Sequence, residues 1–149
     1  MNTPWFFAAS FGIIRNSDWN ILFQKRLNTW YRDWFYQLPS WHIEKHESMQ
    51  NSMIRELKEE ININVKNLKV SHITQWVNEK WRDYFNIYFE IIDYTWEIKN
   101  LEKGKCSELY WANEKEIKEN PYFSKDKEIL EYINKWVCFS ETTPNDDEF

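Results

Sequence analysis

The chain has 149 residues, of which 42% are hydrophobic and 29% charged, so it suits one domain with a single core under a soluble surface. Its formal net charge of −5 argues against non-specific binding to a nucleic-acid polymer, and no apolar run is long enough to span a bilayer. No signal peptide is predicted, because the N-terminus lacks a basic segment, and two distant cysteines fit a cytoplasmic protein without a structural zinc site.

The N-terminal part of the chain is predicted to be β-structure. An apolar strand at residues 6–14 is followed by a polar turn, and residues 21–26 are predicted to pair with it as a hairpin. A shorter strand is predicted at residues 35–38, where Pro39 ends it.

The period of the apolar residues then changes to that of a helix over residues 49–61. One apolar stripe recurs every four residues and consists of Met49, Met53, Leu57 and Ile61. Ser48 can cap the N-terminus of this helix. Asn62 can adopt the left-handed conformation that often ends a helix.

The rest of the chain is predicted to continue as a mixture of strands and helices. Strands are expected at residues 65–77, 84–94 and 108–111, a helical turn at 113–119 and a last helix at 125–135. Residues 1–140 are predicted to form the domain, and residues 141–149 an acidic, flexible tail. This order of elements indicates a layered α/β or α+β domain.

Three carboxylates of the predicted helix share one face. Glu56, Glu59 and Glu60 stand at i, i+3 and i+4. The ordinary interpretation is a solvated acidic face. Beside a divalent cation, however, the same cluster is a set of hard oxygen ligands of the kind that Mg²⁺ prefers.

The pattern around these carboxylates resembles the Nudix box. That box reads Gly, five residues, Glu, seven residues, Arg-Glu, an aliphatic residue, any residue, Glu-Glu, any residue, Gly and an aliphatic residue. The matching positions are Glu47, Arg55, Glu56, Leu57, Glu59, Glu60 and Ile63, whereas the two glycine positions hold Trp41 and Asn62. Residues 31–44 resemble the family's approach to the box, and residues 100–111 resemble the N-x-E-P-x-K-C-x-E-L-x-W segment of one subgroup.

The resemblance implies a fold, a cofactor and a reaction. The fold would be an α/β/α sandwich with a mixed central sheet and a catalytic loop–helix–loop. Glu56, Glu59 and Glu60 would bind Mg²⁺, for which Mn²⁺ could substitute, and Glu56 or a neighbour would act as base on the attacking water. Glu47 and Arg55 would brace the loop–helix–loop as an ion pair. The reaction would be hydrolysis of a nucleoside diphosphate linked to another moiety, with a nucleoside triphosphate, including a damaged one, as the leading substrate.

Four further residues are candidates for substrate binding. His42 could touch a phosphate, although a loop histidine is more often structural. Trp111 could stack on a base, although a tryptophan at a strand end is more often part of the core. Glu44 could reach the metal side or be a solvated turn residue, and Glu108 could be an additional carboxylate that contacts the metal or the base.

Glycine and tryptophan occur in unusual numbers. The chain has 10 Trp and 2 Gly, where typical usage predicts about ten Gly. Six tryptophans occupy contexts in which glycine is usual: Trp19, Trp30, Trp34, Trp41, Trp96 and Trp136. Such sites often need a positive φ, which is strained for a bulky side chain. A surface rich in Trp for stacking ligands is the ordinary explanation. The positions of the tryptophans at predicted turns favour a different explanation, in which UGA codons that encode glycine have been read as tryptophan.

Two other functions compete with pyrophosphate hydrolysis. The chain could be a catalytically impaired Nudix-fold module that binds a nucleotide or a protein, or a structural protein with an acidic helix. The complete set of Glu56, Glu59 and Glu60 argues against the binding module, whereas Trp41 and Asn62 argue weakly for it. The extended motif match argues against the structural protein. The expected partner is a small nucleotide, with neither a nucleic-acid polymer nor a membrane, and the expected assembly is a monomer or a homodimer.

Overall fold

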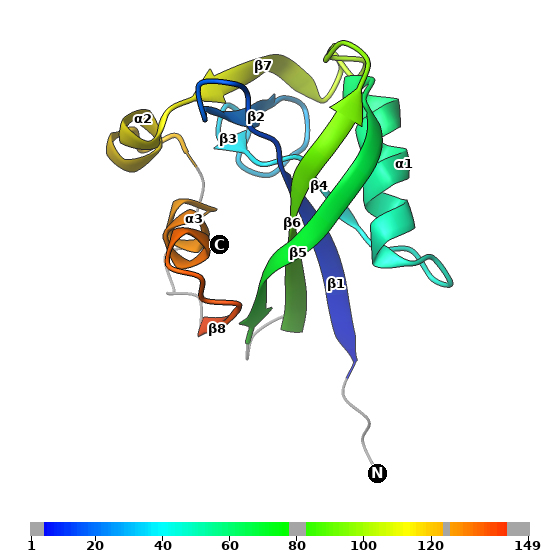
Figure 1. Ribbon diagram of the computed structural model, residues 1–149, viewed down its shortest axis with the longest axis vertical. Coiled ribbons are helices and arrows are strands. Elements are labelled where there is room, and N and C mark those ends of the chain that lie inside the picture. The colour runs from blue at the N-terminus through cyan, green and yellow to red at the C-terminus, as the bar shows by residue number, and fades with distance from the viewer. Residues whose placement is uncertain (1–4, 78–82, 124–125, 143–149) are drawn as a thin grey trace.

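The computed structural model describes residues 5–77, 83–123 and 126–142 (Figure 1). Its elements follow in this order: β1 (Phe6–Ile13), β2 (Ile21–Arg26), β3 (Tyr36–Gln37), β4 (Ser40–His42), α1 (Met49–Ile61), β5 (Asn64–Trp76), β6 (Asp83–Thr95), β7 (Cys106–Ala112), α2 (Glu114–Glu119), α3 (Asp126–Asn134) and β8 (Phe139–Thr142).

The strands form two sheets. The larger has the order β4-β1-β6-β5-β8, in which β1 runs parallel to β6, β5 runs parallel to β8, and the other neighbours are antiparallel. The smaller is antiparallel, in the order β3-β2-β7. Helix α1 covers one face of the larger sheet and α3 lies on the other side (Figure 1). The predicted α/β/α sandwich with a mixed central sheet is therefore confirmed.

Each face of the larger sheet has its own apolar core. On one face, Met53, Leu57 and Ile61 of α1 pack with Ile87 and Phe89 of β6. On the opposite face, the neighbouring strand residue Tyr88 packs with three apolar residues of α3, namely Ile129, Leu130 and Ile133. This arrangement follows from the alternation of side chains along a strand. None of the helices in the described ranges is long and apolar enough to cross a membrane.

Helix α1 begins and ends where the sequence predicts. The Ser48 side chain accepts a hydrogen bond from the backbone N–H of Asn51 at 3.2 Å. Asn62 has φ 66°, in the left-handed region, and its backbone N–H reaches the last carbonyls of the helix. The predicted stripe is shorter by one member, since Met49 in the first turn is 45% exposed. Both ends of the helix that carries the carboxylates are thus fixed by local hydrogen bonds.

The predicted hairpin between the first two strands is wrong. Strand β1 pairs with β4 and β6, whereas β2 pairs with β3 and β7 in the other sheet, and a single bridge between Arg15 and Ile21 joins the two segments. The chain therefore crosses from one sheet to the other at the turn. Strands β4 and β8 were not predicted. Because β8 pairs with β5, residues 141 and 142 belong to the sheet and not to a tail, and residues 143–149 lie outside the described part.

Candidate active site

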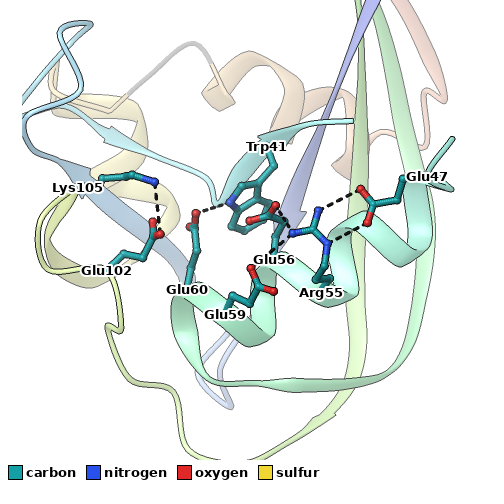
Figure 2. Close-up of polar contacts among 8 residues, drawn as sticks. All are labelled: Trp41, Glu47, Arg55, Glu56, Glu59, Glu60, Glu102 and Lys105. Carbon is teal, nitrogen blue, oxygen red and sulfur yellow. Dashed lines mark hydrogen bonds and ion pairs between the residues drawn. The ribbon is translucent and has the colours of Figure 1, made fainter. Parts of the chain in front are cut away.

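The carboxylates of the Nudix-box pattern gather on α1 and on the turn before it (Figure 2). Glu47 lies in the turn that follows β4, one residue before the helix cap. Arg55, Glu56, Glu59 and Glu60 all lie on the second half of α1. The buried stripe of the helix holds it against the larger sheet, so the remaining faces can present charged groups.

Arg55 and Glu47 form the ion pair that the resemblance implies. Arg55 Nε donates to Glu47 Oε1 at 2.9 Å and Nη2 donates to Oε2 at 3.0 Å, which is a bidentate contact. The hydrogen bonds from Arg55 hold the pKa of Glu47 below its usual range, and Glu47 in turn raises the pKa of Arg55. The contact fixes the turn to the helix.

The same guanidinium also contacts two carboxylates of the helix. Arg55 Nη1 donates to Glu56 Oε1 at 2.6 Å and lies 3.5 Å from Glu59 Oε2. The Glu56 side chain is 17% exposed, whereas that of Glu59 is 61% exposed. Arg55 therefore offsets the mutual repulsion of Glu47, Glu56 and Glu59 and orders them around one centre of positive charge.

Glu60 lies in a different environment from the other carboxylates. It accepts hydrogen bonds from the indole N–H of Trp41 and from Gln24 Nε2, the latter at 3.1 Å. The pKa of Glu60 is raised to about 7, mainly by partial burial and also by the nearby Glu102, against the effect of these two donors. Glu102 is itself paired with Lys105 Nζ at 3.4 Å. Figure 2 shows the Trp41 indole against the Glu60 carboxylate.

The carboxylate oxygens of the site are ligands of the kind that Mg²⁺ prefers. Glu56, Glu59 and Glu60 offer carboxylate oxygens from one helix, and Mg²⁺ takes one or two such ligands and keeps its other positions for water and phosphate. Within the described ranges, no three acidic, histidine or cysteine side chains converge closely enough to hold a metal ion. The hydrogen bonds explain why: Glu60 turns toward Trp41 and Gln24, whereas Glu56 turns toward Arg55.

A cleft of about 760 Å³ opens beside Glu60. This volume is in the range of small-molecule sites. Aromatic, amide and cationic groups line it together with two carboxylates: Phe11, Gln24, Arg26, Tyr31, Gln37, Trp41, His42, Glu60, Trp76, Tyr84, Asn86, Glu102 and Lys105. A ligand with a flat ring and a negatively charged group would match these surfaces.

The four substrate-binding candidates lie in different places. His42 lies on β4 and lines the cleft, with its ring centroid 5.9 Å from that of Tyr84. Glu44 is exposed in the turn after β4. Glu108 accepts from Tyr36 at 2.6 Å and pairs with Lys25 at 3.3 Å. These two partners belong to the smaller sheet, so Glu108 is engaged there.

Trp111 belongs to the packing of the core. It lies on β7 opposite Leu22 and packs against the apolar cluster beneath α1. It is not among the described residues that line the cleft. The structure therefore supports the core interpretation of Trp111 over base stacking.

Several residues of the cleft were missed by the sequence analysis. Gln24 and Glu102 flank Glu60, and Asn86 and Tyr84 lie on β6. The sequence contained a signal for Gln24. It lies two residues after the buried Leu22 on the same strand, so its side chain points to the same face of the sheet, toward α1. For Asn86 no local pattern indicates the cleft, since its position depends on how β1, β4 and β6 pair.

Comparisons with known proteins identify the family. Residues 6–147 match the NUDIX domain, so the chain belongs to the Nudix family. Similar solved structures include a MutT Nudix hydrolase from Burkholderia pseudomallei (TM-score 0.74, 15% identity, covering 90% of this chain and 99% of that one). They also include a MutT protein from Methanosarcina mazei Go1 (TM-score 0.76, 16% identity, 91% and 97%) and one from Bacillus halodurans (TM-score 0.73, 20% identity, 96% and 93%). At these identities the likeness shows the fold. No curated protein sequence matches the chain.

Proposed function

We propose that the chain is a Mg²⁺-dependent pyrophosphohydrolase of small nucleotides. Its substrate would be a nucleoside diphosphate linked to another moiety, with a nucleoside triphosphate, intact or damaged, as the first choice. The observation that carries the proposal is the arrangement around Arg55, which pairs with Glu47 and orders Glu56 and Glu59 on the helix that holds Glu60 at a cleft. A net charge of −5 favours a small, metal-neutralised substrate over a polymer.

The chemistry would be the attack of water on phosphorus. A new bond forms between the water oxygen and the phosphorus, the bridging bond between phosphorus and oxygen breaks, and the leaving phosphate carries away the bridging oxygen. Glu56 or a neighbouring glutamate would accept the proton of the water. A bound Mg²⁺ would supply charge stabilisation on the phosphate oxygens. Arg55 and Glu47 would hold the loop–helix–loop in shape, and the cleft would hold the nucleoside.

A comparison of three proteins tests this proposal. The Trp41→Gly chain, its Glu59→Gln derivative and its Glu119→Gln derivative are incubated with a panel of nucleotides and Mg²⁺, and phosphate and pyrophosphate are measured. Glu119 is an exposed residue at the end of α2 and serves as the matched charge control. We expect Glu59→Gln to lower hydrolysis by about 10²–10³-fold and Glu119→Gln to leave it unchanged. Equal release by all three proteins would overturn the proposal.

One observation favours a second candidate for the chain as written. The indole N–H of Trp41 donates a hydrogen bond to Glu60, so one carboxylate of the proposed metal-binding set already has a partner. A chain in this state would act as a nucleotide-binding module with impaired catalysis. This second candidate predicts that the chain with Trp41 binds a nucleotide without hydrolysing it, whereas the Trp41→Gly chain hydrolyses it.

A further inference from the structure

Five tryptophans have a backbone conformation that residues other than glycine rarely adopt. Their φ angles lie in the left-handed region: Trp19 (64°), Trp30 (65°), Trp34 (73°), Trp96 (78°) and Trp136 (59°). In the described ranges only four other non-glycine residues have positive φ, and two of those are asparagines, which tolerate it. Neither Gly12 nor Gly104 has positive φ. Tryptophan thus takes up the conformation for which glycine is the ordinary residue.

The same five side chains gain little from burial. Their exposed fractions are 74% for Trp19, 101% for Trp30, 57% for Trp34, 53% for Trp96 and 88% for Trp136. Three of the rings lie near a cation: Trp19 near Arg15, Trp96 near Lys58 and Trp136 near Lys69. At exposed sites such contacts contribute little and do not explain a strained backbone.

Trp76 and Trp111 differ from these five in every respect. Both lie in strands, both are partly buried, and neither has a positive φ. Trp76 packs against Tyr84 at a centroid distance of 5.9 Å, and Trp111 packs against the core beneath α1. They behave as tryptophans whose indoles contribute to packing, so they provide an internal standard for the others.

Trp41 is unusual for a different reason. Its sequence context predicts a turn that needs glycine, but Trp41 lies in strand β4, pairs with Ser10 of β1 and has no positive φ. The expected conformational need for glycine is therefore wrong at this position. What is unusual is the place of the side chain. The indole projects to the α1 side and donates to Glu60, at the boundary between the carboxylates and the cleft. A glycine here would leave that space to a metal ion or a phosphate.

We propose that the protein made by its own cell carries glycine at residues 19, 30, 34, 41, 96 and 136, each encoded by UGA. Some genetic codes read UGA as glycine and others as tryptophan, so a single decoding difference accounts for all six positions at once. The change would raise the glycine count from 2 to eight, near the roughly ten expected of such a chain. The glycine form relieves five strained residues and opens the space beside Glu60, which the tryptophan form fills.

The codons and the mass of the native protein test the decoding directly. The gene is sequenced, and the protein isolated from its source is digested and its peptides weighed. We expect UGA at the six positions, peptide masses with glycine there, and UGG codons with tryptophan masses at residues 76 and 111. An alternative is that the exposed tryptophans form a ligand surface, since Trp19 and Trp136 line a second hollow of about 880 Å³ on the α3 side of the sheet. Tryptophan masses at the six positions would overturn the proposal.

The role of residue 41 is tested separately and rests on the proposed function. Two recombinant chains are compared, one with all six glycines and one with the other five glycines but with Trp41 retained. Calorimetric titration with Mn²⁺ alone measures metal binding without any turnover. We expect the six-glycine chain to bind Mn²⁺ at least about tenfold more tightly, the size of effect seen when groups that orient metal ligands are changed. Equal binding would overturn the assignment of Trp41 as the group that fills the site. If the six-glycine chain binds Mn²⁺ but hydrolyses no nucleotide, the proposed function alone fails.

Discussion

The substitution Trp30→Gly should make the protein more stable, which is rare for the removal of an aromatic residue. Trp30 has φ 65° and is 101% exposed, so its indole contributes no burial that could be lost. A residue with a Cβ atom costs about 1–2 kcal/mol in the left-handed region. The greater freedom of glycine in the unfolded chain takes back about 0.5–1 kcal/mol. The net expectation is a gain of about 0.5–1 kcal/mol in the free energy of unfolding.

The comparison with alanine isolates the backbone from the side chain. Trp30→Ala also removes the indole but keeps Cβ, so it should leave the free energy of unfolding nearly unchanged. Urea titration of both variants measures the difference as a shift of the midpoint at constant slope. Ile92 on β6 is the control, because it is 52% exposed and does not have a positive φ. There glycine should be less stable than alanine by about 0.5–1 kcal/mol. If Trp30→Gly is no more stable than Trp30→Ala, the argument from φ is refuted.

Three further predictions concern the site and the helix that carries it. Arg55→Lys cannot keep the bidentate contact with Glu47, so kcat/KM for a hydrolysed nucleotide should fall by about 10²-fold while the circular dichroism spectrum stays unchanged; full activity would contradict the bracing role. Glu60 has its pKa raised to about 7 by burial, so the folded state binds its proton more tightly than the unfolded state and stability is lost as pH rises from about 4.5 to about 7. Glu60→Gln should therefore raise the urea midpoint at pH 8 without metal and not at pH 4, and an equal shift at both pH values would show that the carboxylate does not titrate this way. Leu57 of α1 is fully buried against the larger sheet, so Leu57→Ala should cost about 2–5 kcal/mol in a urea titration, and a cost below about 1 kcal/mol would contradict the packing.

The sequence predicts local structure well and long-range pairing poorly. Helix α1 has the predicted bounds because its signals are local: an apolar residue at every fourth position, Ser48 as cap and Asn62 as stop. The partner of β2 was wrong because pairing depends on which strands meet in three dimensions, and the chain crosses between sheets after β1. Strands β4 and β8 are short edge strands of three and four residues, and too few residues carry their pattern.

The candidate site divides in the same way. The spacing of Glu56, Glu59 and Glu60 predicts their shared helix face, because a helix fixes distances along its own axis. The ion pair of Glu47 with Arg55 was implied by the resemblance to the Nudix box, and the structure contains it. The environment of Glu60 depends instead on Gln24 from β2 and Trp41 from β4, which are far from it in sequence and come close only through the two sheets. Burial raises the pKa of Glu60 against the lowering effect of these two donors, and because burial depends on how the sheets pack around α1, the raised pKa is a property of the fold.

Glycine can be required for two different physical reasons, and the chain separates them. At residue 30 the reason is the backbone, since φ is 65° and the side chain lies in solvent. At residue 41 the reason is space, since the backbone is that of an ordinary strand and the indole lies against Glu60. Alanine should therefore act differently at the two positions. Trp41→Ala removes the indole and keeps an allowed conformation, so it should bind Mn²⁺ as tightly as Trp41→Gly does, whereas Trp30→Ala should not reproduce the stability of Trp30→Gly. Calorimetry on the first pair and urea titration on the second measure the two effects independently. If the Trp41→Ala chain binds Mn²⁺ no more tightly than the chain with Trp41, glycine is needed at residue 41 for its backbone. The explanation that the indole fills the space beside Glu60 is then wrong.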